Sequence, residues 1–288
     1  MIEKRVPATI EVIQVGERFG PIEYLLAEKD VAAYMGEGQD GGECLTLPDG
    51  RRAAAPTITA RDYGRLLTTK YLTDTAAYAK VYQEYKKPVV APVALTVAGA
   101  IVDKYIRRGR EYLVLEVDTH DDASDLVAIS HHTIWINTAA LHDLSEDTPR
   151  AETRHEPALA GQAEQLPSLA KIARMTPPPG GHKWGSPHND EYARQVLGLR
   201  AGLVPGNTTM CYVGEMLRLF FGLAWLEKGV MDISFVGGGA VSQDPVTARG
   251  EVRRRLPEGA TTRLEVDVRL ENHATGQPAI LGSASCTL

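Results

Sequence analysis

Hydrophobic and polar residues alternate along five stretches of the chain, which is the pattern of strands with one buried face. These stretches are residues 111–119, 126–136, 247–255, 262–270 and 279–287. Turn-forming pairs such as Asp121-Asp122 and Thr275-Gly276 separate them, and such short connections favour antiparallel pairing. The pattern therefore predicts antiparallel sheet in both halves of the chain.

Two other stretches are predominantly apolar without this alternation, and each predicts one long helix, over 57–72 and 207–227. A shorter helix is predicted before each of them, over 28–35 and 190–197. A long helix wrapped by a curved antiparallel sheet is an α+β layer architecture, and this is the fold class that we expect.

The chain repeats itself, because four segments of the first half resemble four of the second in the same order. The pairs begin at Phe19 and Leu166, Ala55 and Val204, Ala98 and Ala248, and Leu115 and Leu264. The last three pairs are 149 or 150 residues apart. We therefore predict two repeats, 1–142 and 166–288. The polar segment 143–165, rich in Pro, Ala and Glu, is the predicted linker.

Composition narrows the classes of function. The 288 residues are 43% hydrophobic and 24% charged, as in globular proteins, and their formal net charge is −6. The basic runs Arg107-Arg108 and Arg253–Arg255 lie beside predicted strands, so solvated strand ends are favoured over a nucleic-acid-binding face; weak attraction of a carrier phosphate is the alternative. There is no apolar run of about 18 residues, so we expect no membrane span. The three cysteines (Cys44, Cys211 and Cys286) and the absence of a signal-peptide pattern favour the cytoplasm.

A local motif carries a resemblance to a known family. His188-Asn-Asp190-Glu-Tyr-Ala resembles the His-x-Asp signature of MaoC-like hydratases and dehydratases, and 202–210 is similar to that family's loop into its long helix. In the first half, 54–58 resembles the helix entry of a non-catalytic repeat. The resemblance implies a double hotdog fold, in which the second repeat is catalytic and the first is mainly structural and lines the pocket.

The resemblance also implies roles for residues of the second repeat. His188 lies on a loop rich in Gly and Pro, and its imidazole suits proton transfer near neutral pH. Gly206 begins the long helix, so its N–H is expected to stabilise an enolate oxygen, unless it is simply a helix-start glycine. Asp190 belongs to the motif and is a second catalytic candidate, and it also has the position of a helix N-cap. Val204 and Asn207, on either side of Gly206, are expected to bind substrate.

The sequence departs from the family at the helix entry, where Pro205-Gly206 stands in place of His-Gly, and at one position before the histidine. Typical members have an aspartate five residues before the histidine, and here that residue is Lys183, which we expect to contact substrate instead. A substitute carboxylate is sought in Asp62, on the first long helix, which would meet His188 across the two repeats. Glu215 is the carboxylate to suspect in a hotdog thioesterase, although a structural pair with Arg218 is the favoured interpretation.

These observations lead to one main hypothesis and several alternatives. The first is a lyase that hydrates an α,β-unsaturated acyl thioester or dehydrates a β-hydroxyacyl thioester, carried by coenzyme A or an acyl carrier protein. The alternatives are a biosynthetic cyclase or isomerase that uses His188 as acid and base, a thioesterase, and a non-catalytic acyl-binding subunit. We expect no cofactor, no metal and no nucleic-acid partner, and either a monomeric pseudo-dimer or a homodimer.

Other histidines and glycines are assigned structural roles. His131 and His132 are neighbours on a predicted strand, so their side chains are expected on opposite faces. His182 and His188 have no third ligand nearby in sequence, which disfavours zinc. The run Gly237–Ala240 lacks the context of a phosphate-binding loop, and a bulge or a close backbone approach explains it better.

Overall fold

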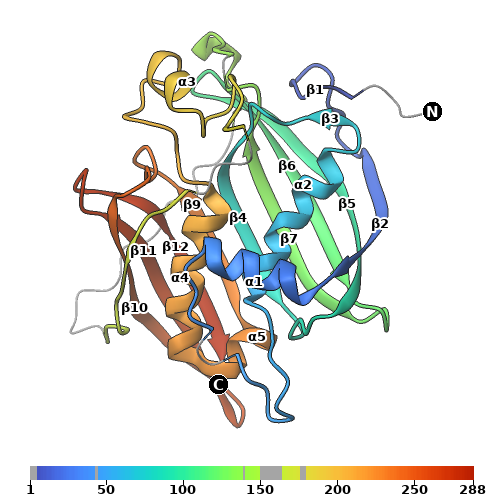
Figure 1. The fold of residues 1–288 in the computed structure, drawn as a ribbon, viewed down its shortest axis with the longest axis vertical. Helices are drawn as coiled ribbons and strands as arrows, with labels where there is room; N and C mark the ends of the chain where they lie inside the picture. Colours follow the sequence, from blue (N-terminus) through green and yellow to red (C-terminus); the bar gives the residue numbers. More distant parts are fainter. Residues whose placement is uncertain (1–4, 43–44, 139, 150–163, 176–179) are drawn as a thin grey trace.

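A computed structural model describes residues 5–42, 45–138, 140–149, 164–175 and 180–288. Its main element is a curved ten-stranded antiparallel sheet that wraps around the helices (Figure 1). The strands of the first half are β2 (Arg18–Leu26), β4 (Ala77–Tyr85), β5 (Val93–Arg107), β6 (Arg110–His120) and β7 (Leu126–Trp135). Those of the second half are β8 (Leu169–Ile172), β9 (Val230–Phe235), β10 (Pro245–Glu258), β11 (Thr261–Asn272) and β12 (Gln277–Thr287).

The strand order is the same when read outward from the middle of the sheet in either direction: β2-β5-β6-β7-β4, then β9-β12-β11-β10-β8. At the centre, β4 pairs with β9, and Lys80 Nζ lies 2.9 Å from a carboxylate oxygen of Asp232 across this seam. The matched sequence segments fall on equivalent elements, because β2, β5 and β6 correspond to β8, β10 and β11. The predicted α+β architecture with two related halves is therefore confirmed.

The predicted linker 143–165 is described only in part. Residues 150–163 lie outside the described residues, and 143–149 contain a short 3-10 turn, Leu144–Glu146. The division at 142 and 166 stays a prediction. Cys44 also lies outside the described residues, whereas Cys211 and Cys286 are buried free thiols.

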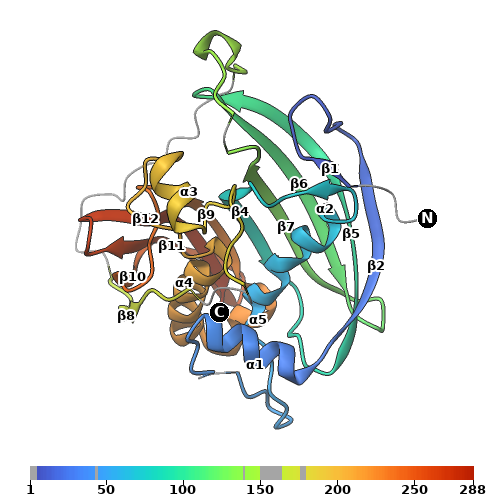
Figure 2. The same cartoon turned by 45° about the horizontal axis from the view of Figure 1, so that its top comes forward.

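The long helix of the second half begins at Gly206. It is α4 (Gly206–Phe221), and Gly222, at a φ of 62°, ends it before a short turn and α5 (Trp225–Lys228). Its apolar side chains pack with those of β10, β11 and β12 in one core cluster. Figures 1 and 2 show α4 lying in the hollow of the sheet, and α4 packs against the 3-10 helix Pro56–Arg61 of the first half.

The predicted long helix over 57–72 is wrong. The chain forms a 3-10 helix, Pro56–Arg61, and a short α2 (Asp62–Leu67). β-Branched residues follow Pro56, and Thr59 Oγ1 donates to the Pro56 carbonyl (3.0 Å), which favours the tighter turn. At the other end the Thr68 hydroxyl donates to the carbonyl of Gly64 (2.6 Å). The chain then turns into β3 (Tyr71–Leu72), which pairs in parallel with β1 (Val6–Pro7).

The two short helices are confirmed as α1 (Glu28–Glu37) and α3 (Asp190–Gln195). No helix among the described residues is long and apolar enough to cross a membrane. His132 is fully buried and the side chain of His131 is 43% exposed, so the two rings face opposite sides of β7 as expected.

The predicted ion pair between Glu215 and Arg218 on α4 is wrong. Arg218 Nη2 instead lies 2.6 Å from Asp40, which follows α1, and Lys171 Nζ of β8 lies 2.8 Å from Glu215. All four side chains are at most 14% exposed. A charge on a buried helix needs a partner in its immediate surroundings, and here the neighbouring elements supply closer ones than the helix itself. The Asp40–Arg218 pair also joins the two halves of the chain.

Candidate functional site

A cavity of about 460 Å³ lies where the β4–β9 seam meets the beginning of α4. Both halves of the chain line it. Its side chains are mostly apolar or aromatic, and the polar and charged exceptions include Arg108, Arg110, His188, Asn207 and Thr209. No aspartate or glutamate of the described residues is among its lining. An apolar cavity with a few convergent polar groups is the usual form of a small-molecule site.

His188 lies on this cavity, on the loop before α3. Its Nδ1 donates a hydrogen bond to the carbonyl oxygen of Leu203, at 2.7 Å, which leaves Nε2 as the basic nitrogen of the neutral ring. Burial lowers the pKa of His188 below its ordinary value; the bond to Leu203 opposes this shift and the neighbouring His182 adds to it. The ring is therefore neutral at pH 7 and able to accept a proton.

Two loops hold the ring in place. Leu203 N–H donates to the Pro187 carbonyl (2.9 Å), and Gly202 N–H donates to Asp190 Oδ1 (2.8 Å). A side chain at Gly202 would collide with the carbonyl of His188, so the close approach of the two loops requires glycine there. These contacts fix the distance between the imidazole and the chain that leads into α4.

Asp190 is not the helix cap that the sequence indicated. Asn189 has extended backbone, and its Oδ1 accepts from Tyr192 N–H at 2.9 Å, so it is the N-cap of α3. Asp190 is the first helical residue, with its side chain 60% exposed. It is outside the cavity lining of the described residues and acts on the site through its bond to Gly202.

The beginning of α4 opens into the same cavity. Pro205 is its N-cap, and the N–H groups of Thr208 and Thr209 bond to the Pro205 carbonyl (2.9 and 3.1 Å). The N–H groups of Gly206 and Asn207, in the first turn, have no acceptor among the hydrogen bonds of the described residues. They are therefore available to an oxygen with negative charge, which the helix dipole favours.

Two aromatic side chains explain why position 206 is glycine. A Cβ atom there would lie 2.9 Å from the Tyr78 ring and 3.1 Å from that of Phe235. These rings come from β4 and β9, with centroids 5.5 Å apart, and the Tyr78 hydroxyl donates to the Ala60 carbonyl (2.8 Å). The pair packs against the beginning of α4, so any larger residue at 206 would displace the helix or the rings.

Of the residues predicted from sequence, His188, Val204, Gly206 and Asn207 line this one cavity. Besides Asp190, two others are not part of its lining. The side chain of Lys183 is 80% exposed, and its Nζ is 3.9 Å from Asp74. Asp62 is fully buried within the first half.

The carboxylate of Asp62 already has partners. It accepts from the Tyr24 hydroxyl (2.7 Å) and the Thr119 hydroxyl (2.9 Å), one on each oxygen. Burial raises its pKa to about 6, although these bonds and the nearby Arg65 oppose the rise. Asp62 therefore links α2 to β2 and β6. It is not among the residues that line the cavity with His188.

His182, which was assigned only a structural role from the sequence, is in contact with the ring of His188. The two ring centroids are 5.3 Å apart, and His182 Nε2 is buried without a hydrogen-bond partner among the described residues. Burial lowers the pKa of His182 as well. Its place after Gly180-Gly181 in the same loop was the available signal. The neighbouring His182 adds to the lowering of the His188 pKa, which burial mainly causes.

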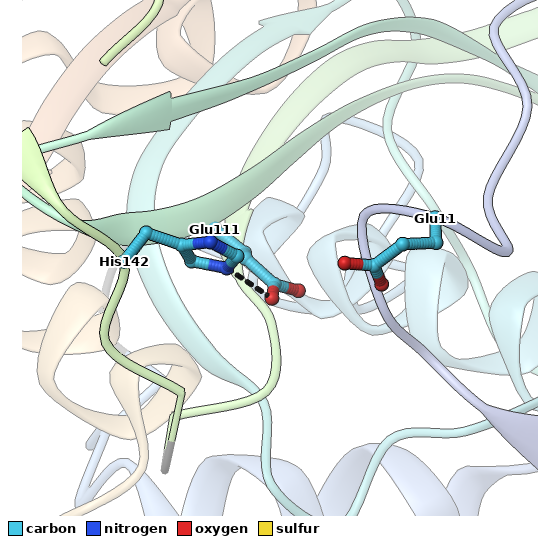
Figure 3. Close-up of side chains that lie close together, drawn as sticks. All are labelled: Glu11, Glu111 and His142. Carbon is cyan, nitrogen blue, oxygen red and sulfur yellow. Dashed lines mark hydrogen bonds and ion pairs between the residues drawn. The ribbon is translucent and has the colours of Figure 1, made fainter. Parts of the chain in front are cut away.

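Three side chains of types that can bind a metal ion lie together outside this cavity. Donor atoms of Glu11, Glu111 and His142 lie within 4.8 Å of one another (Figure 3). Glu111 accepts from His142 Nε2 (2.7 Å) with one oxygen and from Ile10 N–H (2.9 Å) with the other. Both carboxylate oxygens of Glu111 therefore already accept hydrogen bonds from the protein, and the bond from His142 attaches that residue to β6.

The fold is shared with solved structures. No protein-family model and no curated protein sequence matches the chain. A MaoC-like dehydratase from Phytophthora capsici is 12% identical, with a TM-score of 0.64 over 98% of each chain. The putative MaoC domain dehydratase from Chloroflexus aurantiacus is 8% identical, with a TM-score of 0.65 over 99% of this chain and 98% of that one.

A conserved hypothetical protein from Mycobacterium tuberculosis, described as having a double hotdog fold, is 12% identical, with a TM-score of 0.64 over 98% of each chain. At these identities the likeness concerns the fold, and it covers both halves of the chain. Because one fold supports many activities, the shared fold alone does not assign an activity to this chain. The chain has the double hotdog fold, and it resembles the MaoC-like dehydratases that share this fold.

Proposed function

We propose that this protein is a hydratase or dehydratase of acyl thioesters, carried by coenzyme A or an acyl carrier protein. One observation carries the proposal: the basic Nε2 side of His188 and the unpaired N–H groups at the start of α4 belong to one largely apolar cavity. Removal of a proton next to a thioester carbonyl requires both a base and a stabilised enolate oxygen. Val204 and Asn207 would contact the substrate beside Gly206.

The residues support a simple mechanism for dehydration. Neutral His188 takes the proton from C2 of the β-hydroxyacyl thioester, and the resulting enolate oxygen accepts a hydrogen bond from Gly206 N–H. The imidazolium then gives its proton to the C3 hydroxyl, which leaves as water while the double bond forms. Hydration is the reverse, with the neutral ring taking a proton from the attacking water.

A second candidate is an isomerase or a cyclase that acts on the same kind of thioester. The observation that favours it is the absence of a carboxylate from the described lining of the cavity, since a carboxylate would help to hold the attacking water. Lys183, at the position of the family's aspartate, does not replace that carboxylate, because its side chain is 80% exposed and outside the cavity lining. His188 alone suffices to remove a proton from one carbon and return it to another.

The thioesterase alternative has less support. Glu215, the carboxylate that it would use, is 5% exposed and ion-paired with Lys171 at 2.8 Å. A buried and paired carboxylate is a poor nucleophile or general base at neutral pH.

Mass spectrometry in deuterated water separates the candidates. A short enoyl-coenzyme A and its 3-hydroxyacyl counterpart are incubated with the wild-type protein, with His188→Gln, and with His131→Gln as a control on the outer side of β7. Gain or loss of water that depends on His188 alone supports the lyase. Deuterium uptake without net water transfer supports the isomerase or cyclase. No change with either substrate contradicts both and favours the non-catalytic acyl-binding subunit.

A further inference from the structure

Two arginines belong to the lining of the cavity that holds His188. Arg108 and Arg110 come from the turn between β5 and β6 in the first half of the chain, and both are exposed. Neither forms an ion pair with a carboxylate of the described residues, whereas Arg249 and Arg253 on β10 do. The lining of the described residues contains no carboxylate, so these two guanidinium groups give their part of the cavity a positive charge.

The Arg110 side chain is held in place by an aromatic ring. Its guanidinium carbon lies 4.2 Å from the centroid of the Trp135 ring on β7, which also lines the cavity. Stacking on an aromatic face restricts the guanidinium while its N–H groups at the edge stay available to an anion. The group is therefore placed for binding before any ligand arrives.

The turn itself is clamped by the segment that leaves the first half. Asp147 accepts from the backbone N–H of both Arg108 (2.6 Å) and Gly109 (2.9 Å), and His142 N–H donates to the Gly109 carbonyl (2.8 Å). The His142 ring is in turn bonded to Glu111 (Figure 3). Asp147 therefore holds the turn through its backbone N–H groups. It forms no ion pair with the Arg108 side chain.

The pKa of Tyr112, which lines the cavity beside these arginines, is affected by their charge. Burial raises the pKa of Tyr112, the guanidinium groups of Arg110, Arg107 and Arg108 oppose that rise, and the carboxylate of Asp147 adds a smaller contribution to it. Three guanidinium groups therefore act on one lining residue. Phe235 of β9 and Val204, which also line the cavity, are apolar, and β7 and β4 lie between β9 and β6 in the sheet.

We infer that Arg108 and Arg110 form an anion-binding subsite at one end of the His188 cavity, which selects substrates with a phosphate or carboxylate at that end. The inference rests on the proposed function only for the thioester part of the ligand. The anion has two possible sources, the phosphates of the carrier arm or a carboxylate on the acyl group. Guanidinium groups bind both by the same paired N–H geometry.

Calorimetric titration tests the subsite without any turnover, so failure of the lyase assay does not affect it. The ligands are coenzyme A, uncharged pantetheine, and two N-acetylcysteamine thioesters, one with a terminal carboxylate and one with a methyl group. The proteins are the wild type, the double variant Arg108→Ala/Arg110→Ala, and Arg51→Ala, an exposed arginine paired with Asp49 outside this cavity.

We expect the double variant to weaken binding of the matching anionic ligand by about 10- to 100-fold, the effect of losing one or two charge-assisted hydrogen bonds. Binding of the uncharged partner ligand should not change, and Arg51→Ala should behave as the wild type. A loss confined to coenzyme A identifies the carrier phosphates, and a loss confined to the acyl carboxylate identifies the acyl group. Equal affinities of wild type and double variant for all four ligands, or no binding of either anionic ligand to the wild type, would overturn the inference.

Discussion

The imidazole of His188 and the carbonyl oxygen of Leu203 are joined by a hydrogen bond of 2.7 Å, with Nδ1 as the donor. This bond selects the tautomer whose Nε2 is unprotonated. It also links the ring to the loop that enters α4 three residues later, so the base and the helix N–H groups are positioned by the same segment. The geometry of the site therefore depends on one backbone contact as much as on the histidine.

The first prediction concerns the pH dependence of the activity. Burial lowers the pKa of His188, and the neutral ring is the active form, so activity should be lost only as the pH falls through this lowered pKa. The acid limb of kcat/KM should therefore lie below the ordinary histidine value of about 6.5. His188→Gln should reduce kcat by about 10²- to 10⁴-fold.

The measurement is a profile of kcat/KM between pH 5 and 9, together with the NMR titration of the His188 ring. The two should give the same pKa. His131→Gln serves as the control, since the His131 side chain is 43% exposed on the face of β7 opposite to the buried His132 and does not line the cavity. An acid limb at or above 6.5 would contradict a buried neutral base.

The second prediction concerns Gly206. In Gly206→Ala the new methyl group would lie within 3.1 Å of both the Tyr78 and the Phe235 rings, so the start of α4 must shift. We expect kcat to fall by at least about 10²-fold, as for loss of one oxyanion donor. Phe235→Ala in the same chain should restore part of the activity by making room.

The matched control is Gly36→Ala in α1, where no atom lies within 4 Å of the new Cβ. This change should leave kcat unchanged and stabilise the helix by about 0.5–1 kcal/mol, as alanine does in helix interiors. Circular dichroism during urea unfolding and steady-state kinetics measure both effects. Equal activity of Gly206→Ala and wild type would show that the helix start takes no part in catalysis.

The third prediction concerns the buried ion pair between Asp40 and Arg218. Their side chains are 3% and 1% exposed, so Asp40→Asn leaves a buried guanidinium without its counter-charge. The free energy of unfolding should fall by about 3–5 kcal/mol. Asp49→Asn, which breaks the exposed pair with Arg51, should cost less than about 1 kcal/mol. Urea denaturation compares the two, and similar losses would mean that the buried pair contributes no more than a surface pair.

The sequence predicted those elements whose pattern is dictated locally. Alternation located β6, β7 and β10 to β12, and a long apolar run located α4, because a buried face imposes its period directly on the sequence. The same criterion failed at 57–72. There the apolar content was right, but β-branched residues after Pro56 favour a 3-10 turn, and the threonines after Leu67 end the helix.

The site was predictable only where a motif is contiguous. His188 and Gly206 were found because each lies in a short recognisable segment. Arg108 was interpreted as a charged strand end and Arg110 was not singled out, because their place in the cavity depends on how the first half closes against loops of the second. The partners of Glu215 and Arg218 were missed for the same reason, because Lys171 and Asp40 are distant in sequence.

The last prediction concerns Asp62 and the stability of the first half. Its folded-state pKa is about 6 and its ordinary value is 3.8, so the folded protein binds more protons than the unfolded chain between these values. The contribution of Asp62 to the free energy of unfolding is therefore greatest below about pH 4 and is lost as the pH rises to about 6. In Asp62→Asn this dependence should disappear.

At pH 7 the variant should gain up to about 3 kcal/mol, reduced by whatever is lost when one amide oxygen replaces two carboxylate acceptors for Tyr24 and Thr119. Urea unfolding of both proteins at half-unit steps from pH 4 to 7 measures the difference. Asp49→Asn, at an exposed position, is the control that should keep the wild-type dependence. Because Asp62 lies outside the lining of the His188 cavity, kcat should change less than tenfold; a larger loss without loss of stability would assign Asp62 to the reaction itself.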